Sequence, residues 1–204
     1  MNFKFFGKSK KKVVVSTIVI LMLLLLAGGV FLFLNREIKG KPSDYVIRDT
    51  EQGKIIENKR AGFSAKVPDQ WEAKRIEVEE GGLIFYSPDS TINWKDSLAK
   101  LPLEKGCMIR NTVVYKKADF QQIEKDAKEL HFMLGQKYEQ FEALEINGLP
   151  VLKDTFETEE WGKSLSVYVP YKDKVYSFHA HWGDEDEDRC IQEFNKFLET
   201  VAID

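Results

Sequence analysis

Two histidines at alternate positions are the first residues whose spacing could support chemistry. His179 and His181 lie in a run of alternating apolar residues that is typical of a β-strand, so their side chains point to the same face. Two imidazoles on one face could bind a metal ion such as zinc, but zinc sites use at least three protein ligands and no spacing supplies the third. We therefore expect no bound metal and keep both histidines only as candidate ligands. The alternative is that the rings lie on a solvated face, or beneath a helix with their nitrogens satisfied.

Cys107 and Cys190 are the only cysteines. On the oxidising side of a membrane they could form a single disulfide, and no other pairing exists. Closing so long a loop would stabilise the folded state by about 4.5 kcal/mol in the chain-entropy description. The alternative is two free thiols at apolar positions.

The familiar catalytic and cofactor motifs do not occur in this sequence. It has no His-Glu-x-x-His zinc motif, no Cys-x-x-Cys pair and no Gly-x-Gly-x-x-Gly dinucleotide loop. The acidic run 184–188 imitates the start of a calcium loop, but Arg189 stands where such a loop has glycine and Asn195 where it has glutamate. We therefore expect no cofactor and no enzyme activity.

Two tryptophans are candidates for contact with a partner. Trp94 lies in the long unpatterned stretch 88–106, and Trp161 stands beside Gly162 in an expected hairpin. Loops carry a large share of binding residues, and aromatic side chains are frequent anchors of interfaces. For Trp94 the alternative is a small apolar cluster within the loop.

The N-terminal part has the pattern of a membrane anchor. Residues 13–34 carry no charge, and twenty-two helical residues would reach about 33 Å, which matches a hydrocarbon core of about 30 Å. Residues 1–12 hold five lysines and no acid, which predicts a basic cytoplasmic tail and a main domain outside the cytoplasm. We expect a single-pass protein of the cell membrane. The alternative is a signal peptide cleaved near Ala27, which would leave an apolar stub.

The remainder predicts one acidic globular domain. Residues 35–53 are polar and without period, which indicates a linker, and the domain is expected over 54–204. From residue 35 onward, 33 acidic residues outnumber 25 basic ones, a net charge of −8. This charge excludes a basic nucleic-acid-binding surface and favours a cationic partner.

Period-two and helical patterns alternate along this domain. Helices are expected at 119–134, with Phe120, Ile123, Ala127, Leu130 and Leu134 on the buried stripe, and at 186–201. Strands are expected at 62–68, 71–79, 83–87, 108–116, 138–146, 150–159, 163–171 and 175–182. Asn147-Gly148 and the turn at 172–174 indicate hairpins. The pattern predicts an α+β domain, an antiparallel sheet covered by helices.

The opening Gly62-Phe63-Ser64-Ala65-Lys66-Val67-Pro68-Asp69-Gln70-Trp71, together with the final helix at 194–201, resembles the PsbP-like family, named for an extrinsic subunit of photosystem II. The resemblance covers about residues 54–204 and implies an α/β/α sandwich. Many relatives are anchored or exported modules without a known reaction. No binding residue is carried over, because no site motif matches, and photosynthesis is not inferred.

These observations together predict a membrane-anchored, non-catalytic extracytoplasmic module that binds or scaffolds a protein partner. The alternative function is a metal-dependent factor or enzyme that uses the strand face of His179 and His181.

Overall fold

The computed structural model describes residues 38–51, 53–76, 82–92, 103–158, 162–183 and 185–204, together with Met22. The basic tail 1–12, the expected membrane segment 13–34 apart from Met22, and both Trp94 and Trp161 lie outside the described residues. Within these ranges, no helix has the length and apolar character needed to cross a membrane.

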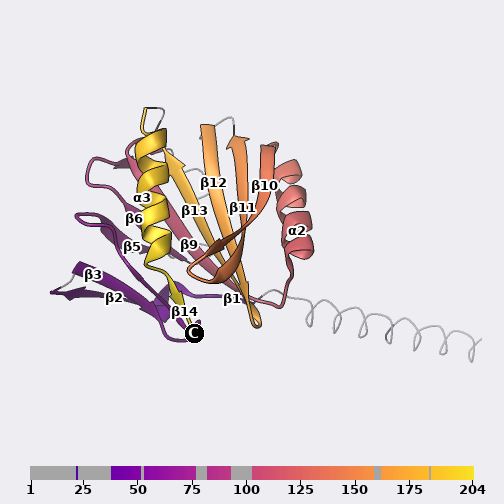
Figure 1. Ribbon diagram of the computed structural model, residues 1–204, viewed down its shortest axis with the longest axis horizontal. Helices are drawn as coiled ribbons and strands as arrows, with labels where there is room; N and C mark the ends of the chain where they lie inside the picture. The colour runs from indigo at the N-terminus through magenta and orange to yellow at the C-terminus, as the bar shows by residue number, and fades with distance from the viewer. Residues whose placement is uncertain are drawn as a thin grey trace, which may run out of the picture. The chain divides into compact units, whose positions relative to one another are not determined.

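A large antiparallel sheet organises the domain (Figure 1). Its strands run in the order β10 (Lys137–Ile146), β11 (Leu149–Thr158), β12 (Gly162–Tyr171), β13 (Lys174–Trp182), β9 (Cys107–Tyr115), β6 (Gly82–Tyr86) and β5 (Glu72–Ile76), with β1 (Ile38–Lys39) beside the end of β9. The predicted hairpins are confirmed: β10 and β11 pair through Ile146 and Leu149, and Asn147 and Gly148 between them both have positive φ, at 53° and 74°. Two residues with positive φ make the tight turn whose twist suits a hairpin.

Two smaller sheets complete the strand set. One has the order β14 (Ala202–Ile203), β4 (Phe63–Lys66), β3 (Gly53–Asn58) and β2 (Tyr45–Thr50), and the other pairs β7 (Thr91–Ile92) with β8 (Leu103–Lys105). The last two strands lie within the unpatterned stretch 88–106, whose sequence shows no strand period.

The predicted linker at 35–53 is wrong from Ile38 onward. This stretch contains β1, a short 3-10 helix η1 (Pro42–Asp44) and β2, and the compact unit begins at Ile38 rather than at residue 54. This stretch is ordered by contacts with residues that are distant in the sequence. Tyr45 is fully buried and its hydroxyl donates a hydrogen bond of 2.8 Å to Asn111 on β9. One buried aromatic residue and pairing with β3 therefore order a polar segment that has no period of its own.

Helix α3 (Glu187–Glu199) lies across one face of the large sheet (Figure 1). It contributes Cys190, Phe194, Phe197 and Leu198 to the main core, where Phe197 packs against Phe85 and Phe178 with ring centroids 5.1 and 5.8 Å apart. The strand residues in this core are the apolar alternates predicted from sequence, such as Val167 and Phe178.

Helix α2 (Phe120–Met133) packs on the opposite face, where Ile123 meets Leu152 and Val175. Asp119 caps the start of this helix, since its side chain accepts a hydrogen bond of 2.8 Å from the backbone N–H of Gln122. The sheet thus has a helix on each side, in agreement with the α/β/α arrangement that the resemblance implies.

The predicted buried stripe of α2 is wrong at its C-terminal end. Leu130 and Leu134 are 43% and 60% exposed, and the buried side chains are Ile123, Ala127 and His131. The helix turns His131 inward because its ring finds a hydrogen-bonding partner on the sheet.

Candidate functional site

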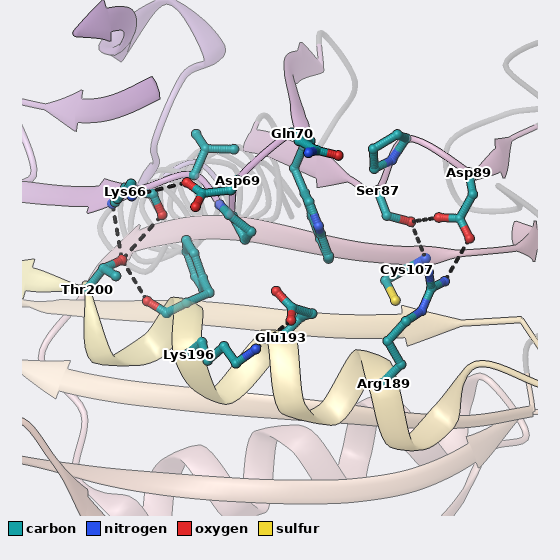
Figure 2. A pocket seen from close by; sticks show the side chains of 15 residues that line it. Lys66, Asp69, Gln70, Ser87, Asp89, Cys107, Arg189, Glu193, Lys196 and Thr200 are labelled. Carbon is teal, nitrogen blue, oxygen red and sulfur yellow. Dashed lines mark hydrogen bonds and ion pairs between the residues drawn. The ribbon is translucent and has the colours of Figure 1, made fainter. Parts of the chain in front are cut away.

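An open groove of about 710 Å³ lies along the outer side of α3 (Figure 2). Its other walls are the β4–β5 turn and the segment that follows β6. The lining residues come from these three segments, from the end of β4 and from the start of β9, among them Lys66, Asp69, Gln70, Trp71, Ser87, Asp89, Cys107, Arg189, Glu193, Lys196 and Thr200. In Figure 2, Lys66, Asp69 and Thr200 lie at one end of the groove, and Asp89 and Arg189 lie at the other.

The lining of the groove carries three basic and three acidic side chains, and Asp186 lies beside it. Lys66 pairs with Asp69 at 3.1 Å and Lys196 with Glu193 at 2.8 Å. Arg189 bridges two carboxylates, Asp89 at 2.9 Å and Asp186 at 2.7 Å. Ion pairs as exposed as these are weak, because water and salt screen them. A bound molecule could therefore exchange partners with the rim charges at little cost.

The floor of the groove is apolar. Trp71, Phe197 and Cys107 all line it and are buried. Trp71 is held by a tight turn in which its N–H donates to the carbonyl of Pro68 at 3.0 Å. Gln70, at the exposed third position of that turn, has φ of 68°, a region that favours glycine. A non-glycine residue in this conformation costs roughly 1 kcal/mol, and such strain concentrates at functional sites.

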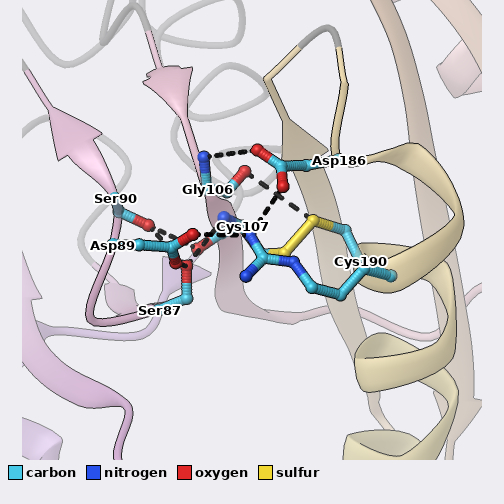
Figure 3. The surroundings of a disulfide bond; sticks show 8 residues. Ser87, Asp89, Ser90, Gly106, Cys107, Asp186 and Cys190 are labelled. Atoms are coloured by element: carbon cyan, nitrogen blue, oxygen red, sulfur yellow. Dashed lines mark hydrogen bonds and ion pairs between the residues drawn. A yellow bond between two sulfur atoms is a disulfide. The ribbon is translucent and has the colours of Figure 1, made fainter.

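A disulfide joins Cys107 to Cys190 (Figure 3), and Figure 2 shows Cys107 at the Arg189 end of the groove. It is the one pairing that the sequence allowed, and it ties the start of β9 to the first turn of α3 with Cα atoms 5.4 Å apart. Hydrogen bonds reinforce the same junction: the N–H of Cys107 donates to Ser87 Oγ at 2.9 Å, and the N–H of Gly106 donates to Asp186 Oδ2 at 2.8 Å. The disulfide therefore ties the α3 wall of the groove to its floor at the start of β9.

The pKa of Asp89 depends on two neighbours at this junction, Ser87 and Arg189. The Ser87 hydroxyl donates to Asp89 Oδ1 at 2.7 Å, and Arg189 lies beside its other oxygen. The hydrogen bond from Ser87, followed by the bond and charge of Arg189, lowers the pKa of Asp89 below its ordinary value. The group stays ionised at neutral pH and keeps Arg189 in place.

His179 and His181 lie on the face of β13 that is opposite to Tyr176, Phe178 and Ala180. Each ring Nδ1 has a serine partner on β12, at 2.6 Å for Ser166 with His179 and 3.0 Å for Ser164 with His181. Burial lowers the pKa of both histidines to about 3, so both rings are neutral at pH 7. In the part of the chain that the structure describes, no three His, Cys, Asp or Glu side chains are placed to hold a metal ion.

A buried polar pair that the sequence analysis missed lies on the same side of the sheet. His131 Nε2 and Asp154 Oδ2 are 2.7 Å apart, and Gln136 Oε1 lies 2.7 Å from Nδ1 of the same ring. Burial favours the neutral ring, but hydrogen bonds with Asp154 and Gln136 outweigh it and raise the pKa of His131 above its ordinary value. The sequence signal that could have revealed this pair is His131 itself, a histidine within the apolar stripe of a predicted helix.

The groove could not be predicted from the sequence. Trp71 belongs to the main core and also lines the groove, and the charged lining residues carry no motif. Trp94 and Trp161 lie outside the described residues and are not placed relative to the groove.

Comparison with known proteins establishes the fold and nothing finer. No protein-family model matches the sequence, and no curated protein sequence matches it significantly. Among solved structures, the chain is similar to cyanobacterial PsbP (CyanoP) from Synechocystis, with a TM-score of 0.51, 8% identity, and coverage of 79% of this chain and 93% of that one.

Two further solved structures are similar at a lower level. One is a Bacteroides thetaiotaomicron protein, with a TM-score of 0.42, 15% identity, and coverage of 70% of this chain and 45% of that one. The other is LpqN, involved in cell envelope biogenesis of Mycobacterium tuberculosis, with a TM-score of 0.42, 14% identity, and coverage of 85% and 94%. The domain is a sheet-rich α+β fold similar to that of PsbP.

Proposed function

We propose that this chain is a membrane-anchored, non-catalytic extracytoplasmic module that binds a protein partner in the groove along α3. The observation that carries the proposal is the groove itself, which combines an apolar floor at Trp71 and Phe197 with a rim of paired, exposed charges. A peptide segment with mixed charges could exchange ion pairs with Lys66, Arg189 or Lys196 and cover the floor.

The disulfide supports the extracytoplasmic placement. Disulfides persist in oxidising compartments and are rare in the cytosol, and the bond between Cys107 and Cys190 is buried within the domain core. The lysine-rich tail before residues 13–34 favours the same orientation from the sequence side.

No observation favours the metal-dependent alternative. His179 and His181 have serine partners at Nδ1, and the described residues supply no third ligand beside them. The proposal therefore places binding in the groove.

Site-specific photocrosslinking in intact cells tests the groove. A benzophenone amino acid replaces Lys196 in the groove or, as the matched control, Lys125 on the outer side of α2; both are exposed helical lysines. We expect a discrete crosslinked partner at position 196 and none at position 125. Equal crosslinking at both positions, or none at 196, would overturn groove binding.

Two kinds of substitution test groove binding without a crosslinker: charge reversal at Lys196 and replacement of Trp161. Lys196→Glu should reduce recovery of the partner by about tenfold, because the reversed charge repels an acidic group of the partner. Lys125→Glu should leave recovery unchanged, because Lys125 lies on α2, away from the groove. Trp161→Ala tests whether the aromatic residue predicted from sequence takes part. Loss of the partner with Trp161→Ala alone, and not with Lys196→Glu, would move binding away from the groove.

Membrane anchoring is tested by extraction and protease access. We expect the full-length chain to stay with membranes in alkaline carbonate and the domain to be cleaved by protease added outside intact cells or spheroplasts. A shortened soluble product would support signal cleavage instead.

A further inference from the structure

The tip of the β10–β11 hairpin reaches the C-terminal end of α3 (Figure 1). Asn147 and Gly148 form this tip, and both are exposed. The side-chain amide nitrogen of Asn147 donates hydrogen bonds to three backbone carbonyls, at 2.9 Å for Glu199, 3.1 Å for Leu198 and 3.4 Å for Val201. An amide group has two N–H protons, so the two shorter bonds use both and the longest contact shares one of them.

This amide caps a helix end from a distant part of the chain. α3 ends at Glu199, and the last carbonyls of a helix have no partner within the helix. The carbonyls of Leu198 and Glu199 belong to this last turn, where a hydrogen-bond donor also suits the negative end of the helix dipole. Asn147 therefore clamps the hairpin to residues 198–201, which we call the α3 exit.

The α3 exit continues into the groove wall and the second sheet. Thr200 lines the groove, and its hydroxyl accepts a hydrogen bond of 3.1 Å from the backbone N–H of Lys66 (Figure 2). β14 begins at Ala202 and pairs with β4. A change at the clamp would therefore act on the segment that forms one end of the groove.

Asn147 is the one asparagine of the sequence that precedes a glycine, whereas the other six precede residues with side chains. The backbone nitrogen that follows an asparagine can attack its side-chain carbonyl carbon, and glycine hinders this attack least because it has no Cβ. A Cβ at Gly148 would meet no atom of the described residues within 4 Å. The hairpin tip therefore combines the reactive sequence with open space around the backbone.

We propose that Asn147 is a site of spontaneous deamidation, and that this modification releases the clamp on the α3 exit. The backbone nitrogen of Gly148 bonds to Cγ of Asn147 while the bond from Cγ to Nδ2 breaks. Nδ2 leaves as ammonia and takes up the proton that the attacking nitrogen loses. Water then opens the cyclic imide and leaves an aspartate or an isoaspartate at position 147. The proposal depends neither on a groove partner nor on a membrane anchor.

The product lacks the donor on which the clamp depends. A carboxylate accepts hydrogen bonds and donates none, so it cannot bind the carbonyls of Leu198 and Glu199. Its negative charge is also repelled by the negative end of the α3 dipole. Loss of the two shorter hydrogen bonds corresponds to a rise of about thirtyfold in the equilibrium for local opening of the α3 exit.

Peptide mass spectrometry of the full-length chain tests the modification site. The chain is incubated in detergent micelles in mildly alkaline buffer, and conversion is followed at Asn147 and, as the internal control, at Asn195, which is also exposed but precedes Lys196. We expect conversion at position 147 to run well ahead of position 195. Conversion at 147 should be faster in urea, because the clamp of the folded domain restrains the amide. Equal conversion at both positions in the folded protein would overturn the site.

Hydrogen exchange tests the release of the clamp. The amides of Thr200 and Val201 should exchange about thirtyfold faster in Asn147→Asp than in the native chain. The amides of β12 should exchange at the native rate and report that the sheet stays folded. The matched control is Glu145→Gln, an exposed residue of the same hairpin, which should leave exchange at the α3 exit unchanged.

The outcomes of the exchange experiment separate the clamp from general loosening. Unchanged exchange at the α3 exit in Asn147→Asp would refute the clamp, even if position 147 deamidates. An equal rise in β12, or the same rise in Glu145→Gln, would also refute it, because the effect would then not be specific to the amide of Asn147.

Discussion

Replacing Cys107 and Cys190 together with alanine should lower the free energy of unfolding of the domain by about 4.5 kcal/mol. The disulfide joins positions 83 residues apart, and the chain-entropy relation for a loop of this length gives about that value at 25 °C. With a urea dependence of about 2 kcal/mol per M, the unfolding midpoint should fall by about 2 M.

The assay is equilibrium urea unfolding of the full-length chain in detergent micelles, followed by tryptophan fluorescence. The native chain treated with dithiothreitol is the matched comparison, because it breaks the bond without removing the buried sulfur atoms. We expect it to lose slightly less stability than the double alanine variant, which also leaves small cavities in the core. A midpoint shift below about 0.5 M, or two thiols that react with iodoacetamide in untreated native protein, would contradict the reasoning.

Three further predictions follow from strained and titrating residues. Gln70→Gly should raise the free energy of unfolding by about 0.5–1 kcal/mol, measured by urea unfolding, because glycine adopts the observed φ of 68° without strain. His179 and His181 have pKa values of about 3 in the folded domain, so the unfolded chain binds more protons between about pH 3 and 6.5. Stability should therefore fall as pH drops through 6.5, by at most about 1.4 kcal/mol per pH unit for each ring, and the double His→Gln variant should flatten this dependence. His131 has the opposite sign: its raised pKa stabilises the fold fully below about pH 6.5, and this contribution is lost as pH rises through the higher folded value. His131→Gln should remove the decline in urea melts above pH 6.5, and an unchanged decline would refute the role of the pair with Asp154.

The disulfide and the groove are linked through α3. Cys190 and Arg189 are neighbours in the first turn of this helix, so loss of the disulfide should loosen the wall that positions Arg189 against Asp89. Partner binding should therefore weaken when the disulfide is reduced.

The sequence by itself determined the local structure of most of the domain. Alternating apolar residues at 165–169 and 176–182 predict strands with one buried face, and those residues do form the core of β12 and β13. Asn147-Gly148 predicts a tight hairpin because both residues tolerate positive φ, and Asp119 predicts a helix start because its carboxylate accepts a backbone N–H. These features depend on neighbours within a few residues, which periodicity and turn chemistry can read directly.

Only the tertiary structure decided the features that depend on distant partners. Tyr45 orders a polar stretch because Asn111 lies on another strand, and His131 turns inward because Asp154 of β11 lies on the sheet face that α2 covers. The groove brings Lys66, Asp89 and Arg189 from three separate segments, and no spacing along the chain relates them. Hydrogen bonds and ion pairs between remote residues leave no period in the sequence, so the fold class could be predicted while the site could not.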